Sequence, residues 1–309
     1  MTNLHQAFID FDSKIKLTKK KKEELLHRRD VVRDKIRNYF KDELKLNQPK
    51  FMSQGSFTIN TALNPIGDNE VDIDDGIYLQ HLLENETTWP TPKEAHKLIT
   101  DALEAHTKDG CKDKTSCVRL IYAGDFHIDL PIYVMKKNHA KLADIELNKW
   151  IASDSKEFKD WFYKYRENEQ TNRVIRYLKA WRDYRRFDFS SIELTILAVN
   201  NFCKDELDDV ALHNTLNKCL QSLNKNSEIL KPVSPYEDLW KNYSKEKKQS
   251  LITNLSDLYD DITAAIKNAS NNRASLILQE QFGDRFPKLE DKKTAPIKEF
   301  NRGAKPWEI

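Results

Sequence analysis

Glycine is scarce in this 309-residue chain, which has only seven. Long apolar runs are missing too, and without about eighteen consecutive apolar residues no membrane span is expected. The four cysteines form no CxxC pair and have no histidine at zinc-finger spacing, so we expect reduced, packed thiols. The first residues, MTNLHQAFIDFDSK, lack the basic and apolar regions of a secretory signal. The expected location is therefore cytoplasmic.

The chain also lacks a large excess of positive or negative charge, because its formal net charge is +2. With 39% hydrophobic and 32% charged residues, the composition is typical of a globular protein, and bulk charge does not indicate a nucleic-acid binder. One local exception lies between Lys14 and Arg37, where eleven Lys and Arg face four Asp and Glu. A solvated helix face is the simpler interpretation of this run, and a polyanion-binding face is the alternative. Since no exposed aromatic residues accompany the run, we expect that nucleic acid is not required.

Periodicity divides the chain into a mixed N-terminal half and a helical C-terminal half. Residues 12–46 have helical spacing without Gly or Pro, which predicts one long helix with at most one break. Strand patterns follow between residues 71 and 134, and after Lys156 nearly every segment has helical spacing. The predicted fold class is α+β. The expected division is an N-terminal helix and core over 1–165, a helical lobe over 166–287 and a polar tail over 288–309.

Acidic residues cluster in a segment whose apolar residues are typical of a strand, VDIDDGIYL from Val71 to Leu79. Asp72 and Asp74 are two residues apart, so both side chains project from one face. The segment FHIDL (126–130) alternates in the same way and places Asp129 on its polar face. Carboxylates converging from two strands suit two Mg²⁺ or Mn²⁺ ions, which can activate a hydroxyl and stabilise a leaving pyrophosphate. Ordinary exposed strand acids are the alternative for the DxD pattern by itself.

Gly55 and Ser56 lie some sixteen residues before this acidic pattern. Glycine allows backbone N–H groups to approach phosphate oxygens closely, and the serine adds a hydroxyl donor. A Gly-Ser turn, a strand-borne DxD and a later strand aspartate together are typical of the DNA polymerase β-like nucleotidyltransferases. Asp75 points to the opposite face from Asp74, so a backbone group or a Lys or Arg partner is expected for it. His127 shares a face with Asp129 and either supports the metal ligands or is simply packed.

Six motifs, in the same order along the chain, resemble the bacterial cGAS/DncV-like nucleotidyltransferases (CD-NTases). The similarity spans roughly residues 10–285 and is greatest to the bacterial cyclic GMP-AMP synthase group. The motifs are QGSFTINT (54–61), DIDDGIYL (72–79), FHIDLPIY (126–133), SDSKEFKDWF (153–162), LKAWRDYRR (178–186) and SSIELTILA (190–198).

The resemblance implies a DNA polymerase β-like core with a C-terminal helical lobe. It implies an enzyme that joins nucleoside triphosphates, here ATP and GTP, into a cyclic dinucleotide of the cGAMP type with two Mg²⁺ or Mn²⁺ ions. Its product would activate an effector in anti-phage (CBASS) defence. The residues carried over by motif are the metal ligands Asp72, Asp74 and Asp129 and the triphosphate contacts Gln54, Gly55, Ser56 and Lys179.

Two serines of the last motif are expected to have different roles. Ser190 and Glu193 have the spacing of a capping box, which occupies the Ser190 hydroxyl with backbone. Ser191 in the first helical turn has a freer hydroxyl beside a positive helix end, so we assign the phosphate contact to Ser191. The aromatic residue that the family would place three residues after the motif serine is Ile59 here. Base stacking must come from elsewhere, and Tyr236 is the candidate.

Two other functional classes stay open. A linear oligonucleotide synthase or an AMP-transferring toxin could have the same fold, and its released product would distinguish it. A non-catalytic nucleotide or RNA sensor is disfavoured, because such a protein has no reason to keep the acidic, serine and lysine residues together. We expect a monomer that does not contact a membrane. We also expect that its product, and not a surface of the protein, binds the effector.

Overall fold

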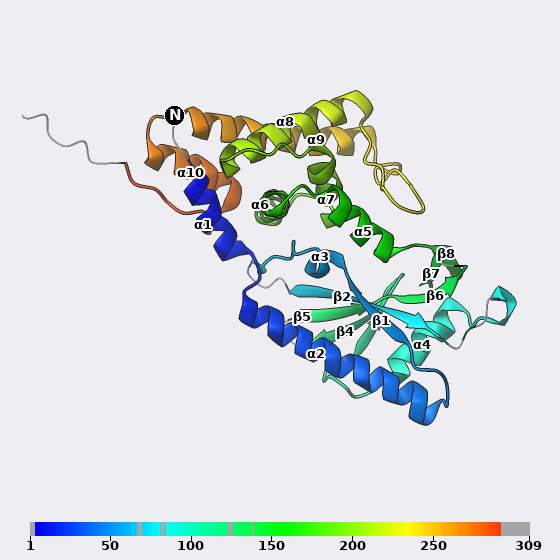
Figure 1. Cartoon of the computed structure of the whole chain (residues 1–309). Coiled ribbons are helices and arrows are strands. Elements are labelled where there is room, and N and C mark those ends of the chain that lie inside the picture. The colour runs from blue at the N-terminus through cyan, green and yellow to red at the C-terminus, as the bar shows by residue number, and fades with distance from the viewer. Residues whose placement is uncertain are drawn as a thin grey trace, which may run out of the picture.

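The chain forms two lobes, one built on a β-sheet and one built of helices (Figure 1). The computed structural model describes residues 4–66, 70–80, 82, 85–122, 126–137 and 139–291. The helices of these residues are α1 (His5–Ile15), α2 (Lys19–Asn38), the π-helix Tyr39–Glu43, α3 (Gly55–Thr58), the 3₁₀ turn Glu86–Thr88, α4 (Pro92–Ala102), α5 (Ser155–Tyr165), α6 (Glu169–Arg185), α7 (Ser191–Asn201), α8 (Asp208–Asn226), α9 (Lys245–Lys267) and α10 (Asn271–Phe282). Within the described part of the chain, none of them combines the length and apolar character of a membrane span.

The sheet is organised around one central strand, β2. Its strands are β1 (Lys50–Gln54), β2 (Val71–Leu79), β3 (Cys111–Asp113), β4 (Val118–Tyr122), β5 (Phe126–Leu130), β6 (Ile132–Lys136), β7 (His139–Asp144) and β8 (Lys149–Ala152). Strands β5 and β6 pair with β2 in parallel at the same register, so they act as one long strand interrupted at Pro131. Strand β1 pairs with β2 antiparallel, while β4 and β7 pair antiparallel with β5 and β6. The predicted α+β class is confirmed.

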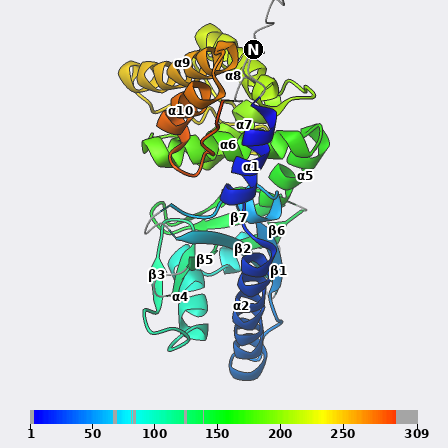
Figure 2. The ribbon, with the colours of Figure 1, turned by 90° about the vertical axis from the view of Figure 1, so that its left-hand side faces the viewer.

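The N-terminal segment is divided between the lobes. The predicted helix over 12–46 is broken once, at residues 16–18, into α1 and α2. Helix α2 lies along the sheet lobe, whereas α1 lies beside α6 in the helical lobe (Figure 2). The apolar face of α1, with Phe8 and Phe11 fully buried, belongs to the core of the helical lobe. This placement puts α1 outside the sheet unit with which the sequence pattern grouped it.

Helix α2 packs on the sheet through three buried residues, Leu25, Val32 and Ile36. Several of its cationic side chains lie over aromatic rings of the sheet lobe, among them Lys22 over Phe57 at 5.3 Å from the ring centroid. Arginine and lysine stems can bury apolar surface in this way while the charge stays in solvent. Part of the basic run therefore has a structural role.

Asp75 is fully buried on the α2 side of the sheet, where Arg33 Nε donates to its Oδ2 at 2.7 Å. Ser53 Oγ donates to the other carboxylate oxygen at 3.1 Å. This pair confirms the expectation that Asp75 binds an arginine or lysine rather than joining Asp74. It also ties α2 to β2, because removing either partner would leave a buried charge unpaired.

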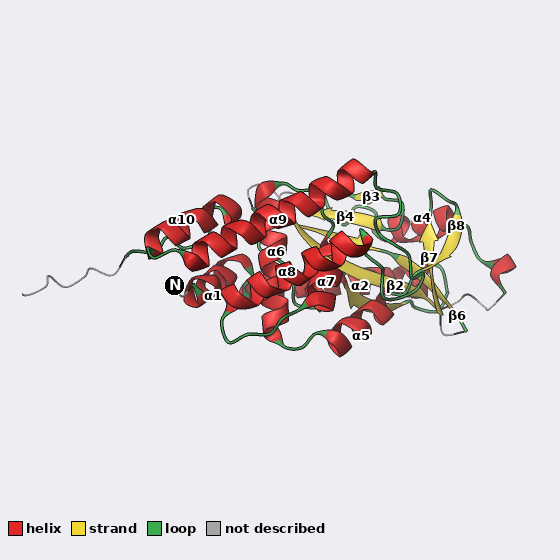
Figure 3. Ribbon diagram, turned by 90° about the horizontal axis from the view of Figure 1, so that it is seen from above, coloured by secondary structure: helices red, strands yellow, loops and turns green. Residues whose placement is uncertain are grey.

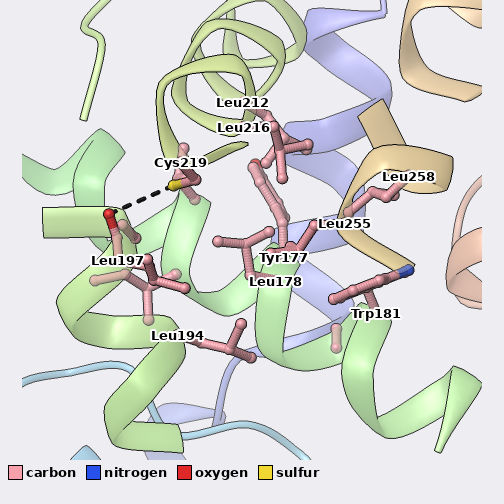
Figure 4. Close-up of a cluster of buried hydrophobic side chains, with 14 of the residues drawn as sticks. Tyr177, Leu178, Trp181, Leu194, Leu197, Leu212, Leu216, Cys219, Leu255 and Leu258 are labelled. Carbon is pink, nitrogen blue, oxygen red and sulfur yellow. Dashed lines mark hydrogen bonds between the residues drawn. The ribbon is translucent and has the colours of Figure 1, made fainter. Parts of the chain in front are cut away.

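The helical lobe has its own core, in which side chains from α6, α7, α8 and α9 interdigitate (Figure 4). Trp181 and Tyr177 are fully buried near its centre. Cys219 is packed there as a free thiol whose Sγ donates to Leu197 O at 3.5 Å. Viewed from above, the helices of this lobe lie beside one another and the strands extend from beneath them (Figure 3). All four cysteines are free, as expected.

We expect Asp208→Ala to lower the free energy of unfolding by about 3–5 kcal/mol, as when a buried ion pair loses one partner. Asp208 is fully buried and accepts hydrogen bonds from Arg173 (2.6 and 2.7 Å), Gln170 (2.9 Å) and Tyr177 (2.8 Å). Burial alone would raise its pKa, but these hydrogen bonds and the Arg173 charge lower it. Chemical denaturation is the measurement. Glu206→Ala, at a nearby exposed site, is the control, and equal effects of the two variants would contradict the network's importance.

Candidate active site

A cavity of about 330 Å³ lies between the sheet lobe and the helical lobe, near the lower end of the size range of small-molecule sites. Its walls come from β1–α3, β2, the start of α5, the start of α7 and the loop after α8. The lining residues are Gln54, Gly55, Ser56, Ile59, Asp72, Asp74, Ser153, Asp154, Ser155, Phe158, Ser191, Ile192, Thr195 and Lys231. Six of the residues expected from the sequence are therefore brought together, and eight lining residues are new.

The strand register brings the predicted carboxylates together. Asp74 of β2 is paired with Asp129 of β5, and Asp72 is paired with His127. In a parallel pair at this register these four side chains project from the same face, while Ile73 and its cross-strand partner Ile128 face the core. Arg119 of β4 binds Asp129 with two hydrogen bonds, at 2.7 and 2.8 Å. The sequence analysis missed this arginine.

Asp74 has the most perturbed carboxylate of the site. Burial, followed by the charges of Asp129 and Asp72, raises its pKa to about 7. Gly55 lies directly against it with φ +67°, and a Cβ on Gly55 would be 1.9 Å from Asp74 Oδ2. The glycine is thus required twice, by its left-handed backbone and by the close approach of the carboxylate.

His127 lies between two carboxylates of the site. Its Nδ1 is 2.9 Å from Glu70 Oε2, and its Nε2 contacts Asp72 Oδ1. Burial disfavours the imidazolium, but the hydrogen bonds that it donates to both carboxylates outweigh burial and raise the His127 pKa. The same contact, against the opposing effect of burial, lowers the pKa of Asp72. Of the two roles left open for His127, contact with an expected metal ligand is the one observed.

The donor set suits a hard divalent cation, since three carboxylates share one face, where burial and then their mutual repulsion raise the pKa of Asp74. Among the described residues, however, no three His, Cys, Asp or Glu side chains are arranged around a common point as metal ligands. Both Asp129 oxygens are bound by Arg119. Asp129 can therefore join Asp72 and Asp74 at an ion through its remaining lone pairs or by exchanging Arg119 for the ion.

Gln54 and Ser56 line the cavity at the end of β1 and the start of α3. Gln54 is buried, and its side-chain Nε2 donates to Tyr133 Oη at 3.3 Å. Tyr133 in turn stacks on Tyr78 with ring centroids 4.9 Å apart. Gln54 is therefore held by the sheet, whereas Ser56 has a half-exposed hydroxyl at the cavity.

Lys179 does not line the cavity. It lies on a face of α6 that binds the three residues following Thr58. The donors on this face are four and three residues apart, as one helix face requires. They are Asn172 to Ile59 O (2.7 Å), Arg176 to Asn60 O (2.6 Å) and Lys179 to Thr61 Oγ1 (3.0 Å). Burial, followed by the Arg182 charge, lowers the Lys179 pKa to about 7.

The two serines differ as expected. Ser190 caps α7 with a capping box, in which Glu193 N donates to Ser190 Oγ at 3.3 Å and Ser190 N donates to Glu193 Oε2 at 2.7 Å. Ser191 lines the cavity, and its Oγ accepts from Arg182 Nη1 at 3.1 Å. Arg182 follows Lys179 by three residues and acts electrostatically on Asp72. It is a second cation that the sequence analysis missed, although it stands in a quoted motif.

Tyr236 is not brought to the cavity. It lies on the loop after α8 and is 68% exposed. Lys231, on the same loop, does line the cavity. Phe158 of α5 lines it too. Phe158 is the only aromatic side chain among the lining residues that the structure describes, and its motif, SDSKEFKDWF, gave no hint of this position.

Two family models match this chain. The model of the cyclic GMP-AMP synthase DncV-like nucleotidyltransferase domain matches residues 49–133, and the model of the cyclic GMP-AMP synthase C-terminal domain matches residues 168–294. The chain belongs to the DncV-like nucleotidyltransferase family. The first match contains the acidic strands, and the second begins just before α6. As a DncV-like nucleotidyltransferase, the chain is an enzyme with a DNA polymerase β-like core.

Curated relatives of this DncV-like nucleotidyltransferase are distant. A cyclic GMP-AMP synthase of Escherichia coli is 26% identical over 79% of this chain and 69% of its own length. A cyclic GMP-AMP synthase of Vibrio cholerae is 28% identical, but the alignment spans only 52% of this chain and 49% of that protein. A c-di-GMP synthase of Roseivirga ehrenbergii is 27% identical over 69% of this chain and 67% of its own length.

Solved structures agree on the fold. Vibrio cholerae DncV in complex with nonhydrolysable GTP has a TM-score of 0.79 at 21% identity, covering 92% of this chain and 97% of that chain. The same enzyme with the linear intermediate pppA(3′,5′)pG has a TM-score of 0.77 at 23% identity, with the same coverage of both chains. The similarity therefore includes both lobes of the DncV-like fold.

Without added metal, Asp74→Asn should stabilise the protein at pH 8 and have little effect at pH 4. The folded pKa of Asp74 is raised to about 7 from a usual value of 3.8, so wild-type stability falls as pH rises through that interval, whereas the amide does not titrate. Thermal melts at both pH values measure the difference. A variant that is less stable than wild type at pH 8 would contradict the electrostatic account.

Ser190→Ala should lower the free energy of unfolding by about 1 kcal/mol, the usual effect of a lost N-cap. Ser191→Ala should leave stability nearly unchanged and raise the KM for triphosphate, because its exposed hydroxyl faces the cavity. Denaturation and steady-state kinetics on the same two variants separate these effects. The reverse pattern would reverse the assignment of roles.

Proposed function

We propose that this enzyme joins two nucleoside triphosphates, ATP and GTP, into a cyclic dinucleotide and releases pyrophosphate. The observation that carries the proposal is the single cavity in which the acidic face of β2 meets Gly55-Ser56 and the start of α7. Relatives at 26–28% identity are named cyclic GMP-AMP synthases, and another is named a c-di-GMP synthase. Because the aligned share of some relatives is only about half, substrate identity is part of the proposal.

Asp72, Asp74 and Asp129 would hold two Mg²⁺ or Mn²⁺ ions, with Arg119 exchanged for metal at Asp129. When bound, such ions activate the attacking sugar hydroxyl and stabilise charge on the leaving pyrophosphate. Gly55 leaves room for the carboxylates and the phosphates to approach the backbone. Ser56 and Ser191 donate hydroxyl hydrogen bonds to the triphosphate from opposite lobes.

Cations of α6 have two separate roles in this proposal. Arg182, which touches Ser191 Oγ at 3.1 Å, contributes positive charge at the phosphate end of the cavity. Lys179 acts mainly by holding Thr61 and thereby the segment that carries Ser56. Its contact with the triphosphate, which the family motif implies, would require the buried ammonium to leave Thr61. Tyr236 could stack on a base only if its loop moved toward the cavity.

A signalling role in anti-phage defence is the biological context that we propose for the product. The product, rather than a protein surface, would then reach a downstream effector. The basic run at the start of α2 supports synthesis without nucleic acid, since its lysines Lys21 and Lys22 lie over the rings of Phe126 and Phe57.

Incubation of the protein with pairs of labelled triphosphates and Mg²⁺ or Mn²⁺ tests the function directly. A product that resists phosphatase and has the mass of a cyclic dinucleotide is the expected result. Phosphatase-sensitive linear oligomers would reject cyclisation and favour a linear synthase. Label transferred to a protein instead would favour an AMP-transferring toxin.

Asp72→Asn combined with Asp74→Asn should abolish synthesis in the same assay while the protein stays folded. Both substitutions keep side-chain size and remove the charges that anchor the ions. The metal-free fold loses the ion pair of Asp72 with His127 but also the repulsion that Asp72 exerts on buried Asp74, so we expect it to stay folded. Product formation and melting temperature are measured together. Undiminished synthesis by the folded double variant would exclude these two residues as metal ligands.

A further inference from the structure

The cavity has two chemically different walls. Its acidic wall, with Asp72 and Asp74, belongs to the sheet. Its apolar wall belongs to the hydrophobic cluster of the helical lobe, into which three of the lining side chains pack: Ile59, Phe158 and Ile192. A nucleotide has the same two parts, a charged triphosphate and a flat, largely apolar base face. The apolar wall is the place for the base.

Phe158 is suited to stacking. It lies in the first turn of α5, and its ring centroid is 5.2 Å from that of the buried Trp161. Packing against Trp161 fixes the ring while part of it still lines the cavity. A base can stack on such a ring whatever its identity, because every base has a π-face. Stacking on Phe158 therefore gives affinity but no choice of base.

Lys231 lines the same cavity as this ring. The residue is half-buried, and its backbone N–H donates to Glu237 O at 2.9 Å, which fixes the chain at the cavity. The acids that act on its ammonium are Glu237 and Glu157, and Glu157 directly precedes Phe158. By contrast, the cations that act on Asp72 are His127, Arg119 and Arg182. Lys231 thus lines the cavity with Phe158, and one of the acids that act on its ammonium directly precedes that ring.

The Lys231 ammonium has no ion-pair or side-chain hydrogen-bond partner among the residues that the structure describes. It is also partly desolvated, since burial lowers its pKa. An ammonium only donates hydrogen bonds. At the edge of a purine it can bind a carbonyl oxygen, whereas an exocyclic amino group in the same position offers another donor and no acceptor.

We infer that Lys231 donates to the edge of a nucleobase stacked on Phe158 and selects a 6-oxopurine, such as guanine, over a 6-aminopurine. The inference deepens the proposed function, on which it rests, by assigning the base at this cavity. A phosphate contact is the competing role for a lysine. Loss of a phosphate contact would weaken the binding of all nucleotides equally, because the triphosphate is common to them.

Direct binding of four α,β-methylene analogues with Mg²⁺ to the full chain tests this assignment without turnover. GTP and ITP analogues carry the 6-oxo group, and ATP and 2,6-diaminopurine triphosphate analogues carry a 6-amino group. The GTP and 2,6-diaminopurine analogues carry a 2-amino group, whereas the ITP and ATP analogues lack it. Wild-type protein should bind both 6-oxo analogues more tightly by calorimetry.

Lys231→Met should weaken binding of the two 6-oxo analogues about tenfold and change the other two by less than about twofold, the effect of one charge-assisted hydrogen bond. Lys225→Met, at an exposed site on α8, is the matched control and should change none. Phe158→Leu should weaken the binding of all four analogues, whereas Phe158→Tyr should bind them as tightly as the wild type does.

An equal loss for all four analogues in Lys231→Met would assign the lysine to phosphate and overturn base selection. Tighter binding of the 6-amino analogues by wild type would overturn it as well. Unchanged binding in Phe158→Leu would remove the stacking site. Since none of these measurements needs a product, they stay distinct from the synthesis assay, whose failure would reject the proposed function instead.

Discussion

Three hydrogen bonds from one face of α6 hold residues 59–61, and the arrangement of the site depends on them. Two of the donors, Asn172 and Arg176, bind backbone carbonyls, so the contact does not depend on which side chains the segment carries. Arg176 also pairs with Asp12 of α1 at 2.6 Å, in a buried contact. The end of α3 is thereby fixed between both lobes, and Ser56 with it.

Much of the fold and of the site can be predicted from the sequence because it depends on local patterns. Alternation along β2 and β5 predicts which carboxylates share a face, and the parallel register then places Asp74 beside Asp129. The spacing of Ser190 and Glu193 predicts a cap that the structure contains. The opposite direction of Asp75 follows from the same alternation, and Arg33 fulfils the expected pairing.

What the sequence could not predict depends on contacts between distant segments. Arg119 is placed within the sheet lobe, where the antiparallel register of β4 and β5 pairs it with Asp129. Lys231 and Phe158 become site residues only after the lobes pack, and no local spacing marks them. The burial of Lys179 against Thr61 has the same cause, since an isolated amphipathic helix does not indicate which lysine meets the other lobe. Strands β1 and β8 are short and lack clear alternation, so periodicity did not reveal them.

The placement of α1 has a consequence for how such a chain can be divided. The first helix completes the core of the helical lobe, with Phe8 and Phe11 against Phe282 and Phe286, although the whole sheet lobe and most of the helical lobe lie between them in sequence. The helical lobe is therefore discontinuous, and the sheet lobe is an insertion within it. A chimaera that exchanges helical lobes between relatives has to carry residues 4–15 along with α5 and everything after it, or the transplanted lobe lacks part of its core.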